Sequence, residues 1–147
     1  MNLYKLHKDP HNLDHHDDVD LVPILAWDRY KDDEDELKKR EKIWAKDSRT
    51  ATSYAAVLNI PFKLGEKAIA KDALNSYSYA KQVLNSRFKL GEKAIAKSAK
   101  FSYLYAVDVV HGRFELGEPA IAKEALFQSK YENYVKFLYL TILLQNQ

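Results

Sequence analysis

Cysteine is absent from this 147-residue chain, which excludes a disulfide framework, a thiol nucleophile and a thiolate metal site. A reducing compartment fits that absence best. Glycine and proline are scarce, at four residues each, which argues against a loop-rich or all-β protein because such folds need many turns. We therefore expect an all-α fold, and the length is that of about one domain.

Other absences narrow the function. No apolar run approaches the roughly 18 residues needed to span a bilayer, and no leader segment with a small-residue cleavage site is visible. No glycine-rich phosphate loop, nucleophile elbow, paired-carboxylate cleft or cofactor fingerprint is present. The sequence thus predicts a cytosolic protein without a membrane partner or cofactor, and not an enzyme.

The chain contains three copies of one 11-residue motif, which we call the phrase. PFKLGEKAIAK, RFKLGEKAIAK and RFELGEPAIAK follow one another at a constant interval of 26 residues, marked by Phe62, Phe88 and Phe114. A second motif keeps the same interval, since Tyr79 and Ala80 recur as Tyr105 and Ala106. A degenerate earlier copy begins at residue 41 and a degenerate later one at residue 131, as expected for the end units of a repeat array.

Each unit is predicted to be a pair of helices. The Leu-Gly-Glu triplet is typical of a helix start, and apolar residues at i, i+1, i+4 and i+5 place a second helix near residues 101–110. We expect Gly112 to end that helix in the left-handed conformation. Neither helix buries its apolar face alone, so we expect a short α-solenoid in which the phrase docks each unit on the next.

The predicted domain organisation follows the repeat. A single helical-repeat domain covers residues 1–147: residues 1–36 form an N-terminal cap segment, residues 37–61 a degenerate repeat, residues 62–87, 88–113 and 114–139 the repeats, and residues 140–147 the end of the C-terminal helix.

Residues 105–123 carry a resemblance. The pattern YAxxVxxGRFxLGExAIAK resembles the repeat of a group of small, uncharacterised proteins encoded by tailed bacteriophages, and the segments at residues 3–7, 13–15, 22–23 and 26–27 are similar to the opening that precedes such repeats. The resemblance brings no catalytic residues. It implies a phage-encoded binding protein in the host cytoplasm, one that inhibits or redirects a host protein or defence complex.

Charge suggests where a partner would bind. The overall net charge of +2 hides a net charge of +3 in each of residues 62–87 and 88–113, between acidic ends of −3 and −1. Tyrosines set two positions before the constant ones should face another side of the helix. The candidate partner-binding residues are Tyr77, Arg87, Lys93, Lys97, Lys100, Tyr103 and Arg113.

Two kinds of partner remain open at this stage. Tyrosine and arginine are enriched at protein-binding hot spots, which favours a host protein. The same residues also suit single-stranded nucleic acid, where aromatic rings stack on bases and cations contact phosphate. For Arg87 and Arg113 the alternative is structural, an ion pair with a neighbouring glutamate between units. The recurrent Glu66, Glu92 and Glu118 are interpreted as helix-start residues rather than catalytic carboxylates.

Histidine and the C-terminal tail raise two further hypotheses. His7, His11 and His15 have the spacing of a weak candidate metal site, although Pro10 interrupts any single helix and a solvated helix cap is the simpler interpretation. The tail at residues 137–144 is apolar around nearly the whole helix. We expect it to be covered by the segment around residues 22–27, and the alternative is homo-oligomer formation through this C-terminal helix.

Overall fold

The computed structural model describes residues 27–145, and every regular element in that range is helical, as the composition predicts. Residues 27–30 form a helical turn. The elements that follow are α2 (Glu34–Trp44), α3 (Ser48–Leu58), η3 (Lys63–Gly65), α4 (Glu66–Ile69), α5 (Ala73–Tyr79), η4 (Ala80–Leu84), α6 (Glu92–Ile95), α7 (Ala99–Tyr105), η5 (Ala106–Val110), η6 (Glu115–Gly117), α8 (Glu118–Ile121) and α9 (Ala125–Gln145).

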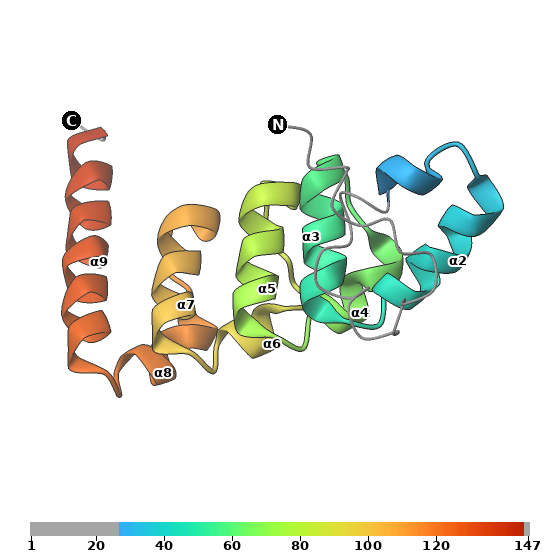
Figure 1. The fold of residues 1–147 in the computed structure, drawn as a ribbon. Coiled ribbons are helices and arrows are strands. Elements are labelled where there is room, and N and C mark those ends of the chain that lie inside the picture. The colour runs from blue at the N-terminus through green and yellow to red at the C-terminus, as the bar shows by residue number, and fades with distance from the viewer. Residues whose placement is uncertain (1–26, 146–147) are drawn as a thin grey trace, which may run out of the picture.

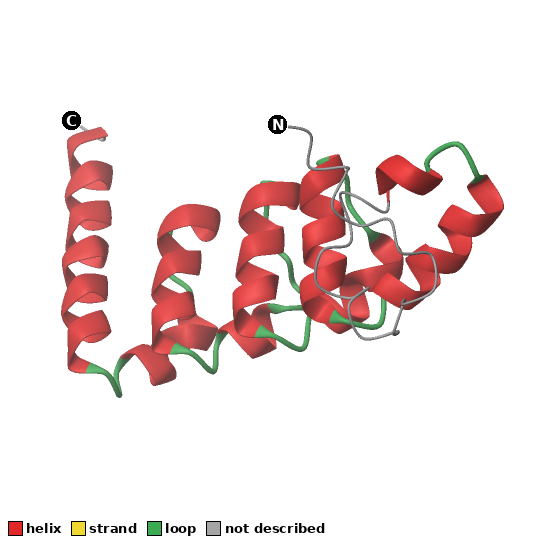
Figure 2. Ribbon diagram, viewed as in Figure 1, coloured by secondary structure: helices red, strands yellow, loops and turns green. Residues whose placement is uncertain are grey.

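The longer helices stand side by side in one row, in chain order (Figure 1). Helix α3 contacts α5, α5 contacts α7 and α7 contacts α9, and the π-helical turns η4 and η5 extend α5 and α7. The short helices α4, α6 and α8 lie along one edge of this row, each between two longer helices (Figure 2). Each 26-residue step therefore adds one short helix and one longer helix.

The degenerate first copy keeps the tyrosine–glutamate hydrogen bond although its sequence has diverged. The Tyr54 hydroxyl donates to the Glu41 carboxylate at 2.7 Å, as Tyr79 donates to Glu66 at 3.1 Å. Trp44 is buried and its ring lies 4.9 Å from that of Tyr54. The early echo of the repeat in the sequence is thus a structural unit.

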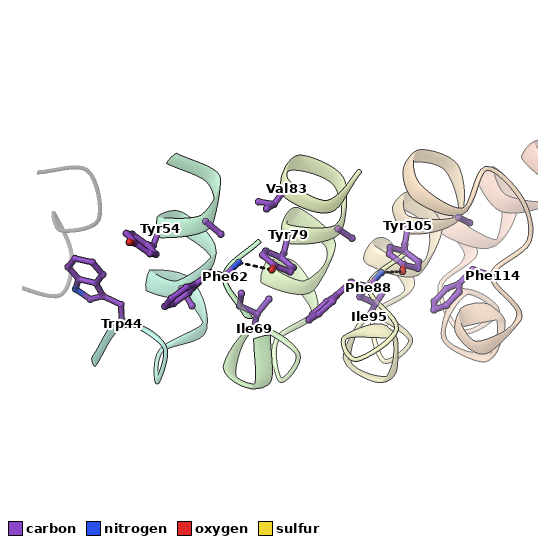
Figure 3. Close-up of a cluster of buried hydrophobic side chains, with 14 of the residues drawn as sticks. Trp44, Tyr54, Phe62, Ile69, Tyr79, Val83, Phe88, Ile95, Tyr105 and Phe114 are labelled. Carbon is purple, nitrogen blue, oxygen red and sulfur yellow. Dashed lines mark hydrogen bonds between the residues drawn. The ribbon is translucent and has the colours of Figure 1, made fainter. Parts of the chain in front are cut away.

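Aromatic pairs join successive units (Figure 3). The Phe88 ring packs edge-on against Tyr79 of the preceding helix at 5.0 Å, and Phe114 packs in the same way against Tyr105 at 5.0 Å. Ile69, Ile95 and Ile121 are buried beside these pairs. The core is therefore a continuous line of equivalent side chains running through the row.

Three of the longer helices end in a residue with positive φ: Asn59, Asn85 and His111. The expectation that Gly112 would take this conformation is wrong, because no glycine among the described residues has positive φ. Asparagine is among the few non-glycine residues that adopt it readily. His111 does so with its ring Nδ1 3.0 Å from the Val107 carbonyl oxygen. The units therefore end alike despite their different sequences.

The apolar tail belongs to α9, which stands at one end of the row (Figure 1). The helical turn of residues 27–30 lies at the opposite end of the row, near α2 (Figure 1), and its first residue, Trp27 of the segment expected to cover this tail, is half-buried there. Trp27 therefore does not cover the apolar tail, and that part of the prediction is wrong. The other residues of the predicted covering segment, 22–26, lie outside the described range.

Candidate functional site

The recurrent tyrosine and glutamate form a hydrogen-bonded latch inside each unit. The backbone N–H of Phe88 donates to the Tyr105 hydroxyl at 2.8 Å, and that hydroxyl donates to Glu92 at 3.0 Å. Phe62 with Tyr79, and Phe114 with Tyr131, repeat the bond at 3.0 Å each. Burial raises the pKa of the Tyr105 phenol, and the Glu92 carboxylate raises it further. A phenol held protonated in this way serves structure rather than proton transfer.

Arg87 and Arg113 bind the glutamates of two of these latches. Arg87 donates to both Glu92 oxygens at 2.7 and 3.0 Å, and Arg113 donates to both Glu118 oxygens at 2.9 and 2.8 Å. The predicted ion pair between units is confirmed, because each arginine is the last residue of one unit and its glutamate lies in the next unit. This pair holds the pKa of Glu118 below its ordinary value. Both guanidinium groups are therefore committed to a structural carboxylate.

Tyr77 and Tyr103 connect successive helices. Their half-buried rings lie 5.9 Å from Phe101 and 6.2 Å from Phe127, each on the next helix of the row. The Tyr77 hydroxyl also donates to Asp108, which accepts from Lys81 at 2.8 Å. These contacts leave each ring only partly accessible for stacking. Sequence reasoning missed the role of Asp108 because its partners are 27 and 31 residues away.

Lys93 and Lys97 are exposed along the edge formed by the short helices. Lys100 is exposed on α7, with its ammonium group 5.5 Å from the Phe101 ring centre. The structure thus places the seven predicted partner-binding residues in four settings: two lysines at an exposed edge, Lys100 on the surface of α7, tyrosines between helices, and arginines in latches.

The same edge carries three leucines that sequence reasoning placed in the docking surface between units. Leu64, Leu90 and Leu116 are 54%, 59% and 53% exposed. Each leucine is followed directly by a buried glycine, Gly65 or its equivalent. Only part of the phrase therefore docks on the neighbouring unit. A regular row of exposed leucines has no role in the core, and its signal in the sequence is indistinguishable from that of a buried leucine.

Lysines lie close to the leucines in the sequence of each unit. Leu64 lies in η3, Lys67 in α4 and Lys71 in the turn after α4, and all three are exposed while Ile69 of the same helix is buried. We call the whole surface the lysine–leucine edge; it consists of Leu64, Lys67, Lys71, Lys89, Leu90, Lys93, Lys97, Leu116 and Lys123. Within the described range, none of its lysines has a hydrogen-bonding or ion-pair partner. The edge is therefore basic and apolar together.

A shallow hollow of about 350 Å³ adjoins this edge between two units. Its lining residues are Ala96, Lys97, Ala99, Pro119, Ala120, Lys123 and Glu124. The alanine methyl groups give it a small apolar floor between two lysines.

The described part of the chain contains neither a candidate metal site nor a helix that could span a membrane. Residues 27–145 contain no group of three or more histidine or acidic side chains arranged to hold a metal ion. The weak candidate site of His7, His11 and His15 lies outside these residues. Of the helices in the same range, none combines the length and apolar character needed to cross a membrane.

Comparisons with protein families, with curated proteins and with solved structures found no match to this chain.

Proposed function

We propose that this protein is a non-catalytic binding scaffold, a short α-solenoid of stacked helical pairs that holds a protein partner along the lysine–leucine edge. The contacts that recur from unit to unit support the stacked architecture. We further propose that it is phage-encoded and acts in the host cytoplasm by inhibiting or redirecting a host protein or defence complex. The motif at residues 105–123 supports that part of the proposal.

The observation that carries the proposal is the composition of the edge. Its lysines lack carboxylate partners within the described residues, so an acidic partner would supply the missing charge. Its three leucines expose apolar surface at equivalent places in successive units. A protein segment with apolar side chains among acidic ones complements both features, because association buries the leucines while the lysines hold the rim.

Nucleic acid is the second candidate, favoured by the unpaired lysines alone. Sequence-tolerant binding of single strands uses exposed aromatic rings as stacking platforms. The edge contains no aromatic residue, and the phenylalanines of its three phrases are buried. Tyr77 and Tyr103 already pack on phenylalanine rings. An acidic protein therefore fits this surface better than a single strand does.

The test uses three variants of the full chain. The first changes Leu64, Leu90 and Leu116 to serine, and the second changes Lys67, Lys93 and Lys97 to glutamate. The control changes Lys130, on α9 away from the apolar extension, to glutamate. Host proteins are captured from nuclease-treated lysate, identified by mass spectrometry and retested with each variant by titration calorimetry.

We expect an acidic protein that binds wild type and control equally and loses at least tenfold in affinity with either edge variant. Fluorescence anisotropy with a labelled single-stranded oligonucleotide provides the opposing readout. If oligonucleotide binding is tight, falls steeply with salt and is unchanged by the leucine variant, the protein is a nucleic-acid binder instead.

A further inference from the structure

Helix α9 continues beyond the level at which its counterparts end. The turns η4 and η5 end at Leu84 and Val110, before the left-handed Asn85 and His111. The 26-residue interval places Phe137 at the same position, yet α9 runs on to Gln145. Residues 137–145 therefore form an extension of about 13 Å, at 1.5 Å per residue. Figure 1 shows this end of α9 rising past the end of the neighbouring α7–η5 helix.

The first part of α9 already closes the row with polar side chains. Positions that are buried or half-buried in the two preceding helices carry exposed polar residues in α9. Ser76 and Ser102 correspond to Gln128, Ala80 and Ala106 to Glu132, and Leu84 and Val110 to Lys136. A polar outer face is what ends a stack of repeats. The extension is therefore not a docking site for a further unit.

The extension itself is apolar and uncharged. Its exposed side chains are Phe137 (64%), Tyr139 (64%), Leu140 (60%), Ile142 (56%), Leu143 (60%) and Leu144 (73%). At about 100 Å² of accessible area each, they present about 600 Å², the upper range for a monomer's largest apolar patch. No aspartate, glutamate, lysine or arginine occurs in residues 137–145. A partner recognised by charge therefore has nothing to contact here.

We propose that the extension is a homodimer contact, in which residues 137–145 of two copies pack antiparallel about a twofold axis. Phe137, Leu140, Leu143 and Leu144 share one side of the helix, so two copies bury about 800 Å² together, the area of a weak and reversible contact. A second copy offers the same uncharged surface, so the contact buries no charge, and a twofold axis closes it.

The lysine–leucine edge lies on the short helices, away from this contact. A dimer therefore presents two copies of the edge, and the dimer contact stands independently of what the edge binds.

Analytical ultracentrifugation of the full chain over micromolar to millimolar concentrations tests the proposal. We expect a monomer of 17.0 kDa in reversible equilibrium with a species of twice that mass. Leu143→Glu should raise the dimer dissociation constant at least tenfold. Leu126→Glu, an equally exposed leucine in the first turn of the same helix, is the matched control and should leave it unchanged.

Cross-linking provides a second measurement that does not depend on those variants. Because the chain contains no cysteine, Leu140→Cys near the centre of the extension introduces a unique probe. Mild oxidation should produce a disulfide-linked dimer with Leu140→Cys and only monomer with Ser53→Cys, an exposed control on α3. A wild-type chain that stays monomeric at all concentrations would overturn the proposal, whether the extension is then covered by residues 1–26 or binds neutral lipid vesicles.

Discussion

At the scale of the residue, the recurrent tyrosine holds each unit together through its hydroxyl. The Tyr105 ring contacts Phe114, while its hydroxyl accepts the buried N–H of Phe88 and donates to Glu92. A buried backbone N–H without a partner is costly, so this hydroxyl removes a penalty that the ring alone would leave. Phenylalanine is therefore a poor substitute for tyrosine at this position.

We predict that Tyr105→Phe lowers the free energy of unfolding by about 1–3 kcal/mol, the cost of leaving the Phe88 N–H unsatisfied. Urea unfolding followed by circular dichroism measures it. Tyr139→Phe, which removes an exposed hydroxyl, is the control and should change stability by less than about 0.5 kcal/mol. Equal losses in both variants would contradict the latch.

The latch also predicts a dependence on pH. Burial, assisted by a neighbouring carboxylate, raises the phenol pKa of Tyr54, Tyr79 and Tyr105. The unfolded chain loses these protons near pH 10 while the folded chain keeps them. Their stabilising contribution is therefore complete below about pH 10 and is lost as the pH rises through the folded pKa values. Urea unfolding between pH 8 and pH 11 should show this decline, with a shallower slope for Tyr105→Phe.

At the scale of the element, the glycine of each phrase sets how closely a short helix approaches the preceding long helix. A Cβ atom added to Gly91 would lie 2.4 Å from the Ser76 hydroxyl oxygen, and one added to Gly117 would meet Ser102 in the same way. Both serine hydroxyls are fully buried and donate to a backbone carbonyl of their own unit. The glycine is therefore required by space, since its φ of −86° at residue 91 suits any residue.

We predict that Gly91→Ala destabilises the fold by about 1–3 kcal/mol, because the added methyl group forces α6 away from α5. Gly112→Ala is the matched control: its nearest heavy atom is 3.8 Å from the added Cβ, so stability should stay within about 0.5 kcal/mol of wild type. Thermal and urea unfolding of both variants measure the difference. A Gly91 variant as stable as the control would show that the close approach is not needed.

At the scale of the whole molecule, the aromatic contacts between units recur, so we expect one unit to be able to replace another. In the unit of residues 88–113, Phe88 packs against Tyr79 of the preceding unit. Tyr105 of the same unit packs against Phe114 of the following unit, at the same ring separation. Removing these 26 residues joins Arg87 to Phe114, which brings Tyr79 to Phe114 and Ser76 under Gly117. The new junction repeats an old one.

We therefore predict that a chain lacking residues 88–113 folds with the same helical content per residue. Its urea m-value should fall by about a fifth, in proportion to the surface removed. Far-UV circular dichroism and urea unfolding measure both quantities. Deleting only residues 88–100 breaks the interval and should abolish cooperative unfolding, because α5 then meets no matching phrase. Equal behaviour of the two deletions would contradict a modular fold.

Much of this architecture can be predicted from the interval. The positions of Phe88, Ile95 and Tyr105 in the core follow from their recurrence, and the Arg87 ion pair follows from a glutamate five residues later. The candidate edge does not follow in this way. Leu90 recurs as faithfully as Ile95, and only the tertiary structure exposes one and buries the other.

The sequence by itself determined the helical class, the repeat and the docking of like units, because these depend on local helix signals and on apolar residues at a fixed spacing. The tertiary structure alone decided which side of each phrase faces solvent, which cations remain unpaired and how far α9 extends past its neighbours. Exposure and charge pairing depend on residues brought together from distant parts of the chain, as Tyr77 and Asp108 are, and no local pattern records that approach.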